Sequence, residues 1–291
     1  MGKFPYQGDQ MGATDLLNNA QDTLTKFPLV LRMGKIRMME PRIKVHIETE
    51  SFLVETVSDP EAFKEIVRLR YNIFLREFAG RGDRYAFFPY DIDLHDFVCD
   101  HLVVKDKSSG SIVATYRLLF QAEGEKKNFY SEGEFDLKEF HNIRGNKLEL
   151  GRACVHREYR TGAVISLLWK GLCQYASKSD TRYMFGCSSL SRRDFEALPF
   201  VIEQLKKRNA VLSDYHVRVR KPFQLSSYPQ LKLPQIVSSD FRSMPSLMNM
   251  YLLAGAKMSI ELAYDGEMDC LDLFTVLDFT RLPASFERRF A

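Results

Sequence analysis

The stretch KLELGRACV, residues 147–155, decides the fold because it predicts a central β-strand that carries two charges. Glu149 and Arg152 are three residues apart, so strict alternation would place them on opposite faces of the sheet. A β-bulge at Gly151 would bring both side chains to one face and splay the strand from its neighbour. The alternative is an edge strand with ordinary exposed charges, which the apolar neighbours disfavour. We therefore expect a splayed central strand.

The segment after this strand, HREYRTG at residues 156–162, leads into a helix expected over residues 163–177. Arg157 and Arg160 precede the helix, and Gly162 stands at its entrance, where the first backbone N–H groups are free. These groups and the positive end of the helix dipole suit a phosphate. By itself this pattern is a weak signal.

An arginine lies on the apolar face of the first predicted helix. Residues 51–57 predict a strand, and SDPE at 58–61 then opens a helix with a capping residue, a proline and an acid. Arg70 follows Phe63 by seven residues and therefore shares its face. A buried arginine requires an anionic partner, because an unpaired buried charge is costly. The alternative is that its side chain extends to solvent.

Candidate partners for Arg70 follow in the segment 90–101, where apolar residues are interleaved with acids. Four aspartates fall within ten residues: Asp91, Asp93, Asp96 and Asp100. A solvated loop and a weak cation site are the alternatives. The spacing of the two histidines in this segment matches no recognised metal pattern, so we expect no metal.

A β-hairpin and four later elements complete the pattern. Residues 101–106 and 111–119 predict two strands joined by the turn KSSG at 107–110. Arg117 is a second arginine on a largely apolar face, here in the second strand of the hairpin. The later elements are expected to be a strand at 182–187, a helix at 194–208, a helix at 245–254 stopped by Gly255, and a closing strand at 270–279.

This order of strand, helix, hairpin, splayed strand, phosphate-facing helix, strand, helix and strand is that of a GNAT acyltransferase. We therefore expect an α/β fold of the GNAT (acyl-CoA N-acyltransferase-like) type, with a mixed central sheet flanked by helices. Residues 1–50 would form an N-terminal extension that associates with membranes. Residues 51–291 would form the acyltransferase domain, with an insertion at about 188–243 before the last helix.

Four motifs resemble hallmark segments of the acyl-homoserine-lactone synthases. They are RYNIF at 70–74, DLHD at 93–96, ATYRLL at 114–119 and LELGR at 148–152. In that family the arginines, the paired aspartates and the glutamate form a buried charged network beside the active site. The resemblance therefore implies a catalytic site that is built from Arg70, Arg117, Arg152, Asp93, Asp96 and Glu149.

Other stretches resemble the ornithine–acyl-carrier-protein N-acyltransferases, which make lyso-ornithine lipid and have relatives that acylate glycine and other amino acids. These stretches are FYSEGEFDL at 129–137, residues 149–169, and MPSL at 244–247 through GAK at 255–257. The resemblance covers about residues 52–290. It implies transfer of a (3-hydroxy)fatty acyl group from acyl carrier protein to the α-amine of an amino acid, with ornithine the expected acceptor.

The loop before the phosphate-facing helix departs from the usual GNAT pattern. Tyr159 stands where Gln or Arg is usual, and Val164 stands where Gly or Ala is usual. This favours a donor held mainly by its phosphopantetheine arm. We expect no permanently bound cofactor and the acyl-phosphopantetheine of acyl carrier protein as donor. The acidic carrier would dock on five basic side chains: Arg157, Arg160, Lys170, Arg192 and Arg193. The alternative is that these are ordinary solvated surface charges.

Amide formation from a thioester requires a neutral amine and a donor for the developing oxyanion. Backbone N–H groups near Cys154 and Val155 are the expected donors, and Glu149 would position or deprotonate the amine, directly or through water. The donor-binding residues would then be Cys154, Val155, Arg157, Arg160 and Gly162. A purely structural charged network is one alternative, with catalysis by proximity. Cys154 as a nucleophile is another, with His156 close in sequence.

Composition bounds the location and the partners. The net charge of +3 does not indicate nucleic acid, and no apolar run is long enough to span a membrane. The five cysteines lie far apart and include no Cys-x-x-Cys pair, which favours a reducing, cytoplasmic compartment. A helix from Thr14 or Asp15 to Lys26 precedes a segment at 26–44 that mixes basic and apolar residues. That segment suits either the inner face of the cytoplasmic membrane, with the protein as a peripheral component, or packing against the domain.

Two other functions stay open at this stage. A signal synthase that makes an N-acyl amino acid, or a lactone from S-adenosylmethionine, would use the same fold. A non-catalytic acyl-binding or haemolysin-like protein would catalyse no reaction.

Overall fold

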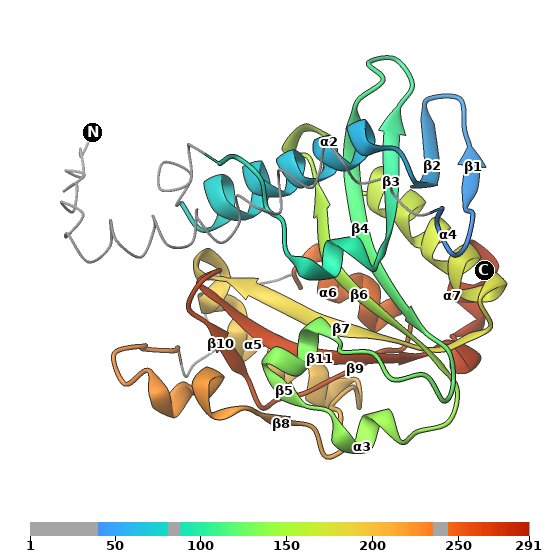
Figure 1. Cartoon of the computed structure of the whole chain (residues 1–291). Helices are drawn as coiled ribbons and strands as arrows, with labels where there is room; N and C mark the ends of the chain where they lie inside the picture. Colours follow the sequence, from blue (N-terminus) through green and yellow to red (C-terminus); the bar gives the residue numbers. More distant parts are fainter. Residues whose placement is uncertain (1–39, 81–87, 235–243, 291) are drawn as a thin grey trace, which may run out of the picture.

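The computed structural model describes residues 40–80, 88–234 and 244–290, which form a mixed sheet with helices on both faces (Figure 1). The strands of this sheet are β1 His46–Glu48, β2 Phe52–Val57, β3 Asp100–Asp106, β4 Ile112–Gln121, β6 Asn146–Val155, β7 Thr181–Ser191, β9 Lys257–Met258, β10 Ala263–Asp265 and β11 Cys270–Asp278. Their order is β1-β2-β3-β4-β6-β7-β11-β10, and β9 pairs with β11. β6 and β7 are parallel, and the other paired strands are antiparallel.

The helices are α2 Pro60–Arg70, α3 Lys138–His141, α4 Ala163–Lys178, α5 Leu198–Lys207, α6 Ser246–Leu253 and α7 Ala284–Phe290. A small second sheet pairs β5 Phe135–Asp136 with β8 Arg218–Val219. α4 packs on the sheet face that carries Leu102 and Val104, whereas α2 packs on the face of Val103. Alternation along β3 therefore places these two helices on opposite faces. None of the helices in the described ranges has the length and apolar composition to span a bilayer.

The locally coded elements form where the sequence predicts them. The Asp59 carboxylate accepts a hydrogen bond from the Ala62 N–H at 2.7 Å, and Pro60 opens α2. The helix then continues as a π-helical stretch over Tyr71–Phe78. The hairpin is β3 and β4, the central strand is β6, the phosphate-facing helix is α4, and Gly255 ends α6 with a φ of +88°. The expectation of an α/β GNAT fold with a mixed central sheet is confirmed.

The structure differs from the sequence prediction in four elements, two strands and two helices. β7 extends to Ser191, into the segment assigned to an insertion, because it pairs with β11 from Tyr183 to Ser191. The α-helix predicted at 194–208 begins only at Leu198, after a 3₁₀ turn over Arg192–Ala197. α7 was not expected, and β1, within the predicted extension, pairs with β2. The helix expected at 14–26 and most of the basic segment lie outside the described residues.

The central strand bulges and separates from its parallel neighbour. Thr115 faces Cys154 and Arg117 faces Gly151, so two residues of β6, Arg152 and Ala153, stand opposite one residue of β4. The predicted bulge is therefore present, although the left-handed residue is Arg152, with a φ of +50°. β6 pairs with β7 only as far as Glu149, and Figure 1 shows the two strands separating beyond their shared end. This separation opens the sheet at its centre.

Candidate active site

A cavity of about 380 Å³ lies where β6 and β7 diverge. Apolar residues from the π-helical stretch, α4 and α6 contribute to its lining, among them Phe74, Ile165 and Leu247. Its polar lining includes Arg117 and Glu149. A mostly apolar space with a few polar groups suits an acyl chain with a polar reacting end.

Arg70 is fully buried and bound by two of the predicted aspartates. Its Nε lies 2.7 Å from Asp91 Oδ2, its Nη1 lies 2.7 Å from Asp96 Oδ1, and its Nη2 lies 3.1 Å from Asp96 Oδ2. The interpretation of Arg70 as a buried, carboxylate-bound arginine is therefore confirmed. Its side chain does not extend to solvent.

Arg117 and Arg152 bind the same group of aspartates. Arg117 Nη1 lies 2.8 and 2.7 Å from the two Asp93 oxygens and 3.1 Å from Asp96 Oδ1. Arg152 Nε lies 3.1 Å from Asp91 Oδ2, and its Nη2 lies 3.5 Å from Asp93 Oδ2. We refer to Arg70, Arg117, Arg152, Asp91, Asp93 and Asp96 as the arginine–aspartate network. Its three positive and three negative charges balance.

The positions of the aspartates are set locally. Asp93 Oδ1 accepts the His95 N–H at 2.8 Å, and Asp96 Oδ2 accepts the Asp93 N–H at 2.9 Å, which forms a capping box on the 3₁₀ turn at 94–97. Burial alone would raise the pKa of Asp96, but the charges of Arg70 and Arg117 hold it below its usual range. The fourth candidate, Asp100, accepts instead from the Arg42 and Ile43 N–H groups and the Tyr175 hydroxyl.

Only part of the network reaches the cavity. Arg117 and Arg152 line it, whereas Arg70, Asp93 and Asp96 do not. The structure thus brings the predicted catalytic side chains together, but it places one arginine and both aspartates behind the cavity wall. Asp93 binds both cavity-facing arginines and Asp96 binds Arg117, while Arg70 holds Asp96 in place.

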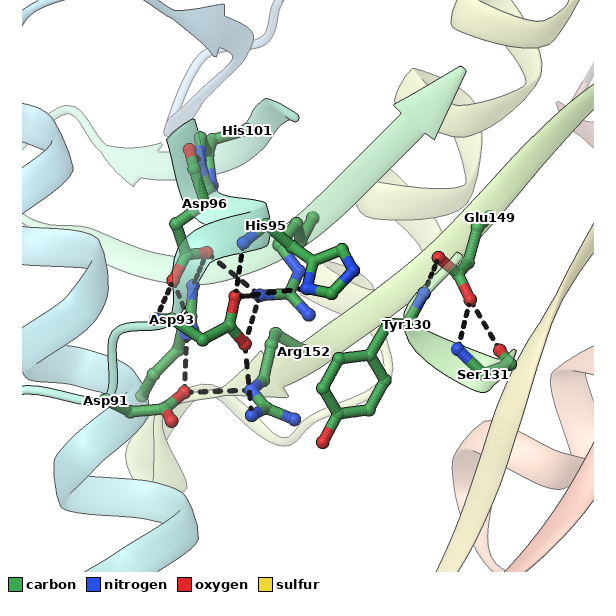
Figure 2. Close-up of polar contacts among 11 residues, drawn as sticks. Asp91, Asp93, His95, Asp96, His101, Tyr130, Ser131, Glu149 and Arg152 are labelled. Atoms are coloured by element: carbon green, nitrogen blue, oxygen red, sulfur yellow. Dashed lines mark hydrogen bonds and ion pairs between the residues drawn. The ribbon is translucent and has the colours of Figure 1, made fainter. Parts of the chain in front are cut away.

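Glu149 lies on the cavity together with Arg152, as the bulge predicts. Its Oε2 accepts the Tyr130 N–H at 2.8 Å, and its Oε1 accepts the Ser131 N–H at 2.7 Å and the Ser131 hydroxyl (Figure 2). Burial raises the pKa of Glu149, although these hydrogen bonds oppose the rise. Both carboxylate oxygens therefore hold the 3₁₀ turn at Tyr130–Gly133 against the central strand.

Tyr130 is a site residue that the sequence did not single out. The Arg152 guanidinium lies 4.8 Å from the centre of its ring, and that of Arg117 lies 5.2 Å from it. The ring therefore covers both arginines with cation–π contacts on the cavity side. The motif FYSEGEFDL contained this residue, but only the fold shows what it faces.

The backbone at the end of β6 presents an N–H to the gap. The His156 N–H bonds to the Val113 oxygen on the β4 side, and successive N–H groups of a strand point to opposite sides. The Val155 N–H is therefore directed away from β4, towards the space that β7 has left. Arg160 Nε donates to the Val155 oxygen at 3.0 Å and its Nη groups bind Glu77.

Of the remaining predicted donor-binding residues, Cys154 and Gly162 line the cavity, whereas Arg157 does not. Gly162 caps α4 with a φ of +86°, and Arg157 is exposed. Cys154 is buried, and burial raises the pKa of its thiol to about 12, which disfavours a thiolate nucleophile.

A second group of carboxylates in the cavity was missed. Glu134, Asp265 and Asp272, which we name the acidic trio, all line it and are 4%, 8% and 2% exposed. Ligand atoms of Asp272 lie within 4.8 Å of those of Glu134 and Cys187, and of those of Asp265 and Cys270. Burial raises the pKa of both thiols. The expectation of no metal stays a prediction.

The fold and the cavity define an acyltransferase of the GNAT class. Residues 69–170 match the family model described as an acetyltransferase (GNAT) domain. Among solved structures, an N-acyl amino acid synthase from uncultured soil microbes aligns with a TM-score of 0.42 at 10% identity, covering 84% of this chain and 99% of its own. A CoA-dependent acyl-homoserine-lactone synthase aligns with a TM-score of 0.42 at 12% identity, covering 78% and 80%.

Curated relatives refine this class. The chain is 30% identical to a Brucella abortus (strain 2308) protein over 81% of its own length and 87% of that protein. It is 32% identical to an Agrobacterium fabrum (strain C58 / ATCC 33970) protein over 75% and 78%, and 29% identical to a Rhizobium meliloti (strain 1021) protein over 96% and 93%. All three are named L-ornithine N(alpha)-acyltransferase. The chain belongs to this family.

Proposed function

We propose that this enzyme transfers a (3-hydroxy)fatty acyl group from acyl carrier protein to the α-amine of ornithine and so forms a lyso-ornithine lipid. The observation that carries the proposal is the family membership, which rests on relatives that share 30–32% identity over at least three quarters of the chain. The cavity at the β6–β7 divergence supports it, because it joins an apolar space to a charged end.

In the proposed reaction the thioester carbonyl lies in the gap between β6 and β7. The neutral α-amine attacks the carbonyl carbon, the C–N bond forms, and the phosphopantetheine thiol leaves with a proton. The Val155 N–H, which is directed into the gap, would donate to the developing oxyanion. Arg152 and Arg117 would attract the acceptor carboxylate, since both line the cavity.

For Glu149 the contacts favour the positioning role over that of a free base. Its oxygens already accept three hydrogen bonds from Tyr130 and Ser131, and these bonds set the Tyr130 ring over the two cavity arginines. A proton leaving the amine would pass to water or to the departing thiolate.

We also propose acyl carrier protein as the donor, with no permanently bound cofactor. Arg157 and Arg193 are exposed. The hydrogen bond from Arg160 and the charges of Arg160, Arg193 and Arg157 lower the pKa of Glu77. The three arginines therefore lie near Glu77 and near one another. Arg160 also lines the cavity, so this basic group borders its entrance. An acidic carrier would be attracted there. The membrane-facing role of the segment 26–44 stays a proposal from sequence; Arg42 within it binds Glu125 of the domain.

The test is acyl transfer from 3-hydroxyacyl carrier protein to a panel of amino acids, read by mass spectrometry. We expect an N-acyl-ornithine product. Glycine or another amine as sole acceptor would overturn the acceptor, a lactone formed with S-adenosylmethionine would identify a signal synthase, and no amide from folded protein would overturn the proposal.

The carrier is tested separately by the charge reversals Arg157→Glu and Arg193→Glu, with Arg218→Glu, at an exposed position of β8, as the matched control. We expect KM for the acyl carrier protein to rise in the first two variants alone, while transfer from a small acyl-pantetheine donor stays unchanged. Equal effects on both donors would contradict docking at this surface.

A further inference from the structure

The acidic trio is the largest group of carboxylates that lines the cavity. Among the described residues, no lysine, arginine or histidine nitrogen lies within 4.0 Å of a carboxylate oxygen of Glu134, Asp265 or Asp272. The three side chains come from different parts of the chain: Glu134 follows the 3₁₀ turn at 130–133, Asp265 ends β10, and Asp272 lies in β11.

The contacts of the trio leave room for a positively charged partner. Asp265 Oδ1 accepts the Glu267 and Met268 N–H groups at 2.7 and 3.0 Å, and Asp272 accepts from the Ser189 hydroxyl and the Cys270 thiol. Glu134 Oε2 accepts from the Cys187 thiol at 3.9 Å, and Glu134 and Asp272 also share a side-chain hydrogen bond. Burial, and then the charges of Asp272 and Asp265, raise the pKa of Glu134 well above its usual range. At neutral pH Glu134 therefore keeps its proton unless a positive charge lies beside it.

An independent observation at the same cavity points to a ligand of mixed charge. Arg117 is 3% exposed and lines the cavity, and its Nη2 has no hydrogen-bond partner. This guanidinium lies beneath the Tyr130 ring and beside Gly151, both of which also line the cavity. Arg152 presents the more accessible guanidinium, with 14% of its side chain exposed.

Tyr130 interacts with charged residues of both signs. The Tyr130 ring contacts Arg152. The charge of Arg152 lowers the pKa of the Tyr130 hydroxyl, but burial and the charges of Glu134 and Asp265 raise it, and the net shift is upward. The cavity is therefore lined by a positive group, Arg117 and Arg152, by a negative group, the acidic trio, and by Tyr130. A neutral amino acid with a single ammonium group would leave the negative group without a partner.

We infer that the cavity selects a diamino acid: the acidic trio binds the terminal ammonium of the acceptor side chain, while Arg152, supported by Arg117, binds its α-carboxylate. This inference rests on the proposed function and assigns acceptor specificity to residues that take no part in the acyl chemistry. The α-amine then lies between the two groups, where it can approach the thioester at the Val155 N–H.

Substrate specificity of trio variants tests the inference. Norvaline is the matched acceptor, because it is ornithine without the terminal amine. We expect Asp265→Asn and Glu134→Gln to lower kcat/KM for ornithine about 100-fold, the usual scale for loss of a buried charge partner, with little change for norvaline. The control Asp214→Asn removes an exposed carboxylate that pairs with Lys257 and should alter neither value.

Equal losses for both acceptors would overturn the inference and assign a structural role to the trio. A wild-type enzyme that acylates ornithine and norvaline equally well would overturn the inference while leaving the proposed acyl transfer intact. Failure of the wild-type enzyme with every acceptor would instead defeat the proposed function.

A binding measurement on the wild-type protein keeps the inference testable if the variants do not fold. A bound ammonium lowers the pKa of Glu134, so ornithine should release protons near neutral pH, whereas norvaline should not. Isothermal titration calorimetry in two buffers of different ionisation enthalpy measures this release. The same ornithine preference appearing only after Mg²⁺ or Mn²⁺ is added would overturn the inference in favour of a metal site.

Discussion

Replacing Arg70 by methionine should destabilise the protein strongly without altering the cavity lining. Arg70 is fully buried and makes three hydrogen bonds of 2.7–3.1 Å to Asp91 and Asp96. Removing one partner of a buried ion pair typically costs about 3–5 kcal/mol. Asp91 keeps Arg152 at 3.1 Å, and Asp96 keeps Arg117 at 3.1 Å. Because neither carboxylate is left alone, we place the loss at about 3 kcal/mol.

Thermal and urea unfolding of the purified variant measure this loss. At about 2–4 °C per kcal/mol for a chain of this size, Tm should fall by roughly 6–12 °C. The matched control is Arg218→Met, since Arg218 pairs at 3.6 Å with Glu261 and both side chains are exposed. An exposed pair contributes about 0–1 kcal/mol, so the control should change Tm little.

A double variant distinguishes the ion pair from the packing of the arginine stem. Asp96→Asn in the Arg70→Met background removes a negative charge that has lost a partner, so part of the stability should return. The reasoning is refuted if Arg70→Met matches the Arg218→Met control in stability. It is also refuted if Arg70→Met keeps its stability but loses kcat, because that would make Arg70 a participant in the reaction.

Three further changes test other parts of the structure. The pKa of Asp93 is lowered in the folded protein, where its hydrogen bond with His95 and the charges of Arg117 and Arg152 outweigh burial. Its contribution to stability is therefore present above a pH of about 4 and is lost on acidification, so Tm measured from pH 7 to 3 should fall less steeply in Asp93→Asn. Gly186→Ala would place a Cβ 2.2 Å from the Leu150 oxygen at the β6–β7 divergence and should cost about 1–3 kcal/mol or prevent folding, whereas Gly133→Ala meets no atom within 4 Å; urea unfolding compares the two. Cys154→Ala should retain most acyl transfer, and loss by orders of magnitude would restore the nucleophile hypothesis.

Sequence patterns predicted the parts of the fold that neighbouring residues determine. Asp59 and Pro60 start α2 through contacts within one turn, and the turn at 107–110 joins two adjacent strands. The period of the first helix likewise required a partner for Arg70, and the nearby aspartates supply it. The bulge followed from two charges at odd spacing in one strand. The cap and the turn depend on interactions that span few residues, and the periodicity of the helix and of the strand indicates which charges face inward.

The tertiary structure alone decided which charges share the cavity. Glu134 is far in the chain from Asp265 and Asp272, which lie on the neighbouring strands β10 and β11, and only the pairing of β11 with β7 brings these two aspartates to the site. The same pairing extends β7 to Ser191. Conversely, Asp100 follows Asp96 closely but binds Arg42 and Tyr175 instead of the network. The sequence by itself determined the fold class and the buried arginines, whereas long-range strand pairing set the composition of the cavity, because hydrogen-bonded neighbours in a sheet carry no signature in local spacing.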